Sequence, residues 1–171
     1  MKIQKTVIAL VFTILSLQSM FSQEFNIPTN VKLETVDDYK TQESNILECI
    51  NWLENTPVSQ DSEKRIMANA FLMQWATGTP TVTIGIQSFQ LDLTKKNADL
   101  LIIFMGGWIK HAIENPDKKD NVEESNLAGI TSIIKVYTAN KGDGIKKDKR
   151  IEKLIKMNEI ELQQWVAEKL K

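Results

Sequence analysis

The sequence predicts an all-α, single-domain bundle of five or six helices around a central apolar helix, with one irregular extended loop. Most of the chain repeats its apolar residues at steps of three and four, as helices with a buried face do. Residues 98–113 are apolar on every side, so we expect them in the middle of the fold. Only residues 81–93 show the two-residue alternation of an extended chain. No repeat, low-complexity tract or long linker divides the chain.

Composition argues against several classes of protein. The 171 residues include 21 basic and 22 acidic side chains, and removing Lys2 and Lys5 of the N-terminal segment leaves 19 basic and 22 acidic ones, a net charge of −3. This balance is not typical of a protein that binds nucleic acid. One histidine, His111, and one cysteine, Cys49, exclude zinc sites built on several such residues. We expect no metal and no cofactor.

Residues 1–22 have the three parts of a secretory signal peptide. Lys2 and Lys5 form a basic start, 6–17 an apolar run, and a polar tail ends at Ser22. An uncleaved anchor helix is the alternative, but the run is shorter than the ~20 residues that span a bilayer. We expect export to the periplasm or the cell exterior, a mature chain beginning at Gln23, and no membrane span in that chain.

The mature domain, 23–171, begins with an extended lead-in over 23–34 that contains Pro28. Phe25, Ile27 and Val31 are its expected contacts with the core. An apolar stripe over 36–53 then predicts one helix, with Thr35 as its N-cap.

Cys49 lies on this predicted helix, beside Ile46, Ile50 and Leu53. As the only cysteine of an exported chain it is either a free thiol or half of a bridge between chains. Its apolar neighbours favour a buried, unreactive thiol.

A second helix is expected to begin near 59–61, capped by short polar side chains, and to end before Pro80. Gly78 is its expected left-handed closing residue. The residues that it should bury are Ile66, Met67, Ala70, Phe71 and Trp75.

Residues 81–93 are predicted to form an irregular packed loop. A hairpin is less favoured because no Asn-Gly or Asp-Gly turn is present. No charged residue lies between Arg65 and Asp92, and a solvated loop would seldom avoid charge for so long. This segment therefore lies against the core, a ligand or a partner.

The central helix, 98–113, contains the pair Gly106-Gly107, which lowers helix stability by roughly 1 kcal/mol per glycine relative to alanine. Such a cost is usually offset by the close approach of another backbone, so we expect a helix to cross here. Further helices are predicted over 122–137, 148–155 and 158–170, the last opened by an Asn158–Glu161 capping box.

Few residues suggest chemistry. His111 reads first as a boundary histidine that hydrogen-bonds a nearby carbonyl, and no Gly-x-Ser-x-Gly motif accompanies it. Residues 140–144 look like part of a calcium loop, but their spacing fails and they read as a helix end and turn. The basic residues of 146–156 form either a solvated helix face or a contact for an anionic partner or membrane surface.

Parts of the chain resemble a known kind of protein. The run Ala68–Trp75, the triplet Gly78-Thr79-Pro80 and the signal end Ser22-Gln23 resemble a group of small exported helical proteins of Gram-negative bacteria with no assigned function. The resemblance covers roughly the middle half of the mature chain and implies no catalytic residue.

We therefore expect a non-catalytic exported module that binds a partner protein or a small apolar ligand, with its oligomeric state open. Its expected ligand or partner face consists of Trp75, Phe89, Trp108 and His111. The four tryptophans of the chain can instead all be core residues. The alternative function is a hydrolytic enzyme that uses carboxylates near His111, and the candidate acids are Asp92, Asp99 and Glu114.

Overall fold

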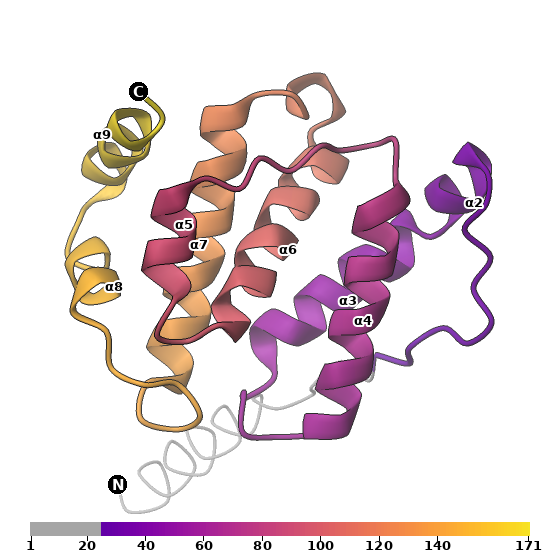
Figure 1. The fold of residues 1–171 in the computed structure, drawn as a ribbon, viewed down its shortest axis with the longest axis horizontal. Helices are drawn as coiled ribbons and strands as arrows, with labels where there is room; N and C mark the ends of the chain where they lie inside the picture. Colours follow the sequence, from indigo (N-terminus) through magenta and orange to yellow (C-terminus); the bar gives the residue numbers. More distant parts are fainter. Residues whose placement is uncertain (1–24) are drawn as a thin grey trace, which may run out of the picture.

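A computed structural model describes residues 25–171, which fold into eight α-helices and one short 3-10 turn (Figure 1). The helices are α2 (Val36–Thr41), α3 (Glu43–Asn55), α4 (Ser62–Gly78), α5 (Ser88–Thr94), α6 (Asp99–Glu114), α7 (Val122–Asn140), α8 (Lys149–Leu154) and α9 (Glu159–Lys169), with the turn η1 (Pro116–Lys118) between α6 and α7. Within this range the only β-type pairing is an isolated bridge between Lys141 and Ile145. The all-α class is confirmed, whereas the expected signal peptide lies outside the described residues.

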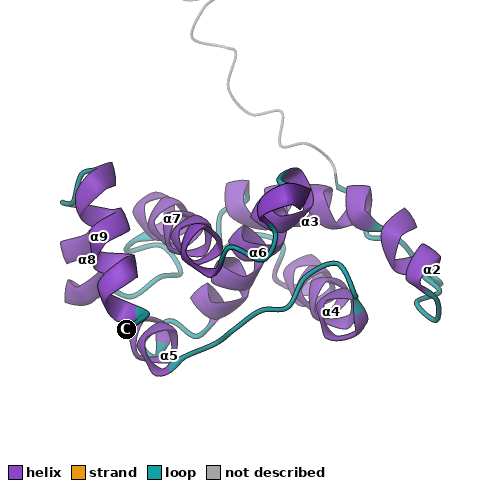
Figure 2. Cartoon of the chain, turned by 90° about the horizontal axis from the view of Figure 1, so that it is seen from above, coloured by secondary structure: helices purple, strands orange, loops and turns teal. Residues whose placement is uncertain are grey.

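Helix α6 is the central helix, as the sequence predicts. It contacts α3, α4, α5 and α7, and the loop between α4 and α5 passes along it (Figure 2). Its buried residues are Leu100, Ile103, Phe104, Gly106, Gly107, Trp108, Ile109 and Ala112. Leu101, Ile102 and Met105 are only half-buried, so one side of the helix is less covered than its apolar sequence suggests.

The expected close crossing at the glycine pair is present, between α6 and α7. A Cβ atom at Gly107 would lie 2.8 Å from the carbonyl oxygen of Ala128 and 2.9 Å from the Cα of Gly129. A Cβ at Gly129 would in turn lie 2.7 Å from the carbonyl oxygen of Phe104. The two helices therefore touch through their backbones, and each contributes a glycine to the contact. Gly106 faces the side chain of Ile50 at an ordinary 3.4 Å instead.

The prediction of a single helix over residues 36–53 is wrong. The helix breaks at Gln42, which ends α2 and precedes α3, and α2 buries none of its residues. Thr35 does cap α2, through a reciprocal capping box with Asp38. Val36 is 64% exposed, so α2 lies on the outside of the fold.

Tyr39 joins α2 to the end of α4. The carbonyl oxygen of Tyr39 accepts a hydrogen bond of 2.9 Å from the indole Nε1 of Trp75, and the Tyr39 ring occupies the space beside Gly78. A Cβ at Gly78 would overlap the Tyr39 hydroxyl. Gly78 is the last residue of α4 and is not among the glycines with positive φ, so its predicted left-handed closing role is wrong. The missing side chain of Gly78 instead leaves space for the Tyr39 ring.

Helix α4 buries a different face from the predicted one. Phe71 and Trp75 are buried as expected, but Ile66 is 69% exposed, Met67 is 55% exposed, and Ala70 is not buried either. Arg65 is only 7% exposed, and its position inside the fold determines which side of α4 faces the core.

Arg65 occupies a core position because the end of α3 offers it hydrogen-bond acceptors. Its guanidinium donates to the carbonyl oxygens of Leu53, Thr56 and Pro57 and lies 5.3 Å from the ring centroid of Trp52. A charged side chain thus caps unsatisfied carbonyls at a helix C-terminus. Helix α4 begins where predicted, directly after Asp61, but Asp61 has φ 47° and does not make the expected side-chain cap.

The predicted loop over 81–93 is only partly correct. Residues 79–87 are irregular, and they form no hairpin, but Ser88–Thr94 is helix α5. Gln87 and Gln90 make a reciprocal capping box that starts it, and the Gln90 amide also donates to Asn126 of α7 at 2.7 Å. Glutamine seldom caps helices, which is why the start of α5 was not visible in the sequence.

The predictions for the lead-in and for the start of the last helix agree with the structure. Phe25 of the extended lead-in is buried against Trp52, and Asn158 opens α9 with the predicted capping box to Glu161. Helices α8 and α9 lie at the edge of the fold, beyond α7 (Figure 2). Within residues 25–171 we find no helix with both the length and the apolar character that crossing a membrane requires.

Candidate functional site

The stretch without charge between Arg65 and Asp92 has an inner and an outer side. Its inner side chains, among them Phe71, Leu72 and Trp75, belong to the core. Large apolar side chains also lie on its outer side, where Ile66 is 69% and Met67 is 55% exposed. The absence of charge therefore reflects both burial and an exposed apolar surface.

The outer side includes a shallow cavity of about 310 Å³ between the end of α4, the 79–87 loop and α6. The residues that line it, all uncharged, are Met73, Ala76, Thr77, Thr79, Val82, Thr83, Ile84, Ile86 and Met105. Ile66, Ala70, Met73 and Thr77 follow one another along α4 at steps of four, three and four, and so lie on one stripe that leads into the cavity. We call this surface the uncharged face and define it as Ile66, Met67, Ala70, Met73, Ile84, Ile86 and Met105.

The residues that define the uncharged face carry no group typical of catalysis. The face contains no acid, base or nucleophile, and three of the six methionines of the chain, Met67, Met73 and Met105, lie on it. Methionine is flexible and polarisable, so it adapts its shape to an apolar surface placed against it.

The two tryptophans of the predicted face are core residues. Trp75 is fully buried. Trp108 is 2% exposed, packs edge-to-face on Phe104 at a centroid distance of 5.9 Å, and lies beneath Gly85 of the 79–87 loop. Both therefore support the uncharged face from inside.

Phe89 and His111 lie elsewhere, each in the wall of a different cavity. Phe89 is half-buried on α5 and meets Trp165 of α9 edge-to-face, with centroids 5.8 Å apart and planes at 85°. His111 is near the end of α6, on the side that faces α7. The four residues that the sequence grouped are thus distributed over the core and two cavities.

The cavity beside His111 has a volume of about 630 Å³ and mixed charge. Its acidic residues are Glu54, Glu114 and Glu124, and its lysines are Lys110, Lys118 and Lys135. The side chain of Glu54 is 5% exposed and accepts hydrogen bonds from Ser132 Oγ at 2.6 Å and Lys135 Nζ at 2.9 Å. Because acids and cations balance, the cavity favours neither an anion nor a cation.

His111 is poorly placed for a fixed catalytic role. Its Nε2 lies 3.7 Å from a Glu124 oxygen, and Lys118 holds the same carboxylate at 3.0 Å. Its Nδ1 lies 3.5 Å from the side-chain amide of Asn115, rather than against the carbonyl that the sequence suggested.

The three acids named for hydrolysis do not meet in one cavity. Asp99 and Glu114 are the first and last residues of α6, about 22 Å apart at the usual helical rise. Glu114 lines the His111 cavity, whereas Asp92, which is on α5, lines a different cavity. A hydrogen bond from Lys95 lowers the pKa of Asp92, which favours a stable anion over a proton donor.

Cys49 is buried, as predicted. Its thiol donates a 3.4 Å hydrogen bond to the carbonyl oxygen of Ala68, and burial raises the pKa of the thiol to about 12. A thiol in this environment is neither a nucleophile nor accessible to a second chain.

The turn after α7 also has a structural role. The side chain of Asn140 accepts a hydrogen bond from the amide of Val58, and Asp143 accepts one from Ser59. Gly142 and Gly144 have φ of 91° and 86°, as a tight turn requires. Among residues 25–171, no three His, Cys, Asp or Glu side chains gather closely enough to hold a metal ion.

Compared with protein-family models, curated proteins and solved structures, the chain matches none of them. The surfaces of the molecule are therefore the basis for inferring its function. The run without charge indicates one of them in the sequence, but the sequence does not single out the exposed Met67 or the half-buried Met73 and Met105 as members of this surface. The positions of Met67 and Met73 depend on which side of α4 faces the core, and the burial of Arg65 determines that side.

Proposed function

We propose that the protein is a non-catalytic, exported binding protein and that its uncharged face docks an apolar segment of a partner protein. The observation that carries this proposal is the exposure of Ile66 and Met67 on α4, followed along the helix by a cavity that only uncharged side chains line. Export rests on the signal-like sequence of residues 1–22.

Single exposed apolar residues are ordinary on protein surfaces, but a continuous group of them is typical of an interaction surface. Depletion of charge and enrichment in methionine are features of the centre of protein interfaces. Covering the exposed parts of Ile66 and Met67 would contribute about 1 to 2 kcal/mol each, given ~1.5 to 3 kcal/mol for full burial of such a side chain.

The shape of the face favours a protein segment over a small apolar molecule. Ile66 and Met67 lie on the outward side of a helix, where a small molecule would remain mostly in water. The adjoining cavity, about 310 Å³, is at the lower limit of ligand pockets, which span roughly 300 to 1,000 Å³. An apolar side chain of a partner fits such a recess while the rest of the segment covers α4.

Site-specific photo-crosslinking tests this proposal in cells that produce the protein. We expect benzoylphenylalanine in place of Met67 to give one discrete adduct, and the same residue in place of Glu168 to give none. Glu168 is a matched control, because it is exposed on α9 at the opposite edge of the fold. Adding Ile66→Lys should abolish the Met67 adduct. Absence of an adduct at position 67, or equal adducts at both positions, would refute the proposal.

A further inference from the structure

A separate cavity of about 410 Å³ lies between three helices from two distant parts of the sequence: α5, α8 and α9. Its apolar residues are Phe89, Leu93, Leu154, Met157 and Trp165, and its charged residues are Asp92, Lys95, Arg150, Lys153 and Lys169. None of them belongs to the uncharged face. A ligand of this cavity would therefore be independent of the proposed function.

The apolar wall of the cavity is already formed. Leu93 and Leu154 are each 3% exposed and connect the wall to the core. Phe89 and Trp165 are half-buried and pack edge-to-face, which fixes the orientation of both rings. A flat or chain-like apolar group could lie on this wall without rearranging it.

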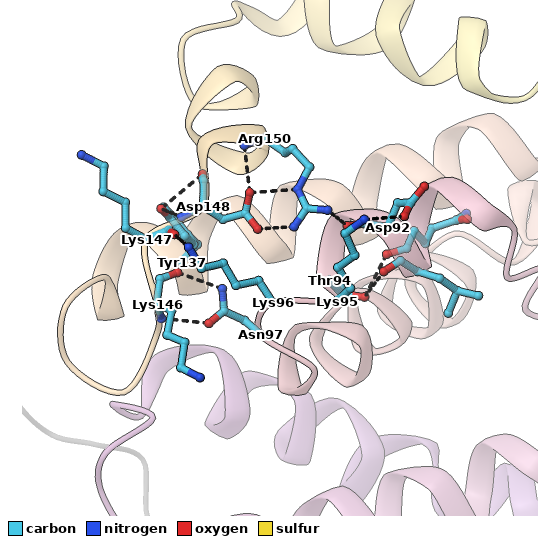
Figure 3. Close-up of polar contacts among 12 residues, drawn as sticks. Asp92, Thr94, Lys95, Lys96, Asn97, Tyr137, Lys146, Lys147, Asp148 and Arg150 are labelled. Atoms are coloured by element: carbon cyan, nitrogen blue, oxygen red, sulfur yellow. Dashed lines mark hydrogen bonds and ion pairs between the residues drawn. The ribbon is translucent and has the colours of Figure 1, made fainter.

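The cations around the wall differ in how far they are neutralised. Arg150 is fully engaged: its guanidinium holds both carboxylate oxygens of Asp148 and also donates to the main-chain carbonyl of Asp92 (Figure 3). Lys95 pairs with the Asp92 carboxylate at 3.0 Å. These two cations are therefore already satisfied by groups of the protein.

Lys153 on α8 and Lys169 on α9 form no ion pair with any residue in the range 25–171. The Lys169 ammonium instead lies 5.7 Å from the ring centroid of Trp165. The two lysines approach the cavity from different helices, so both can reach one anion bound between them. Each would give a charge-assisted hydrogen bond to a carboxylate.

The charge around the cavity is positive beyond these two side chains. Lys95, Arg150 and Lys169 all lower the pKa of Asp92, the hydrogen bond from Lys95 being the largest cause. Lys96, Lys146 and Lys147 lie on the neighbouring loops, next to Asp148 (Figure 3). An anion that approaches this end of the molecule is therefore attracted before it makes contact.

We infer that the cavity binds a small amphiphilic anion, an aliphatic or aromatic carboxylate, with its apolar part on Phe89 and Trp165 and its carboxylate between Lys153 and Lys169. A cavity of 410 Å³ is in the range of small-molecule sites. A purely solvated basic face would explain the lysines but not the preformed aromatic wall between them. Phe89 and Trp165 are half-buried, which suits an enclosed ligand better than insertion into a membrane surface. Leu91, Ile155 and Ile160 are exposed on or beside the same helices, so the test must distinguish a lipid surface from a small ligand.

Decanoate below its micelle concentration is a suitable probe, with 1-decanol as the uncharged control of equal chain length. We expect decanoate to bind about tenfold more tightly than decanol and to shift the indole N–H resonance of Trp165 in a proton–nitrogen correlation spectrum. A tenfold difference in affinity corresponds to about 1.4 kcal/mol, which two partly exposed charge contacts can supply. Decanoate binding should also weaken as salt is raised, because the lysines are exposed.

Matched lysine variants separate the cavity from the general basic surface. The double variant Lys153→Gln, Lys169→Gln should bind decanoate no better than decanol. Lys156→Gln should leave decanoate binding unchanged, because Lys156 is exposed just after α8 but does not line the cavity. All three lysines are exposed, so the variants are expected to fold.

Three results would overturn the inference. Equal affinity for decanoate and decanol would remove the role of charge, and an unaltered Trp165 indole resonance at saturation would place binding elsewhere. Capture of the protein by phosphatidylglycerol vesicles, together with no response to monomeric decanoate, would assign the basic residues to a lipid surface instead.

Discussion

The contact between α6 and α7 differs in kind from the uncharged face, although α6 contributes to both. At the contact, Gly107 and Gly129 bring two backbones together so closely that no side chain fits between them. On the uncharged face, Met105 and Met73 border an open cavity and are only half-buried. Backbone contact permits a single arrangement, whereas methionine side chains permit several. The comparison indicates that the fold holds α6 rigidly from one side and leaves the other side able to adapt to a partner.

The largest effect is expected at the rigid contact. Gly107→Leu should lower the free energy of unfolding by about 3 kcal/mol, because even a Cβ there would lie under 3 Å from α7. Chemical denaturation of the two proteins measures this difference. Gly106→Ala is the control on the neighbouring glycine, since its Cβ would meet only side chains, Ile50 at 3.4 Å and Leu72 at 3.8 Å, and alanine favours the helix by roughly 1 kcal/mol. Equal losses of stability from the two substitutions would contradict a close backbone contact at Gly107 but not at Gly106.

A somewhat smaller effect is expected on the inner side of α4. Arg65→Leu should cost about 2 kcal/mol, because the carbonyl oxygens of Leu53 and Thr56 would lose a charged donor inside the fold. Thermal unfolding checks this. Lys64→Leu, one residue earlier at a half-buried position, should cost less, about 0.5 kcal/mol, because the Lys64 ammonium makes only a cation–π contact with the Trp52 ring, 5.2 Å from its centroid.

The ion pair between Asp148 and Arg150, at the start of α8, should contribute stability that depends on pH. The Arg150 guanidinium lowers the pKa of the buried Asp148 carboxyl below its usual 3.8. The ionised carboxylate therefore adds stability, on the order of 1 kcal/mol, that is present above about pH 4 and is lost as the pH falls through the lower folded-state pKa. Asp148→Asn keeps an acceptor for the α8 N-terminus but not the charge.

Comparing the two proteins from pH 6 to pH 2 tests this dependence. The stability difference between wild type and Asp148→Asn should shrink on acidification, whatever the other carboxylates do. A difference that stays constant over this range would mean that the charge of Asp148 is not used.

The smallest effect on stability is expected on the uncharged face itself. Ile66→Lys should change the free energy of unfolding by less than about 0.5 kcal/mol, since the side chain is 69% exposed. Denaturant titration would reveal any larger loss. A cost above about 1.5 kcal/mol would show that Ile66 is needed for packing, and the face would then be part of the core.

The sequence predicted the parts of the fold that depend on strong local patterns. The apolar character of residues 98–113 predicts their central position, which α6 confirms. A glycine lowers helix stability, so Gly107 predicts a close contact with another helix, and this contact is present. The break at Gln42 has no such pattern: a glutamine with φ −90° and ψ −7° divides α2 from α3, and no glycine or proline marks the place. The start of α5 likewise depends on the mutual hydrogen bonds of Gln87 and Gln90.

The candidate surface was located more accurately along the chain than in space. The lack of charge between Arg65 and Asp92 indicates the segment on which the candidate surface lies, but periodicity alone assigns the wrong side of α4 to the core. The error follows from Arg65, whose burial is stabilised by carbonyls 8 to 12 residues away at the end of another helix. Likewise, the cavity at Phe89 depends on Trp165, which no local pattern connects to α5.

The glycine contact between α6 and α7 also bears on the order of events during folding. The two helices follow one another through the short η1 segment, so their contact joins residues close in sequence and closes a small loop. The wall between Phe89 and Trp165 joins residues 76 positions apart and requires α8 and α9 to return across α7. We therefore expect the α6–α7 hairpin to be structured in the folding transition state and the α5–α8–α9 cavity to close after the barrier. In that order, the anion-binding end of the molecule can open locally while the hairpin stays intact.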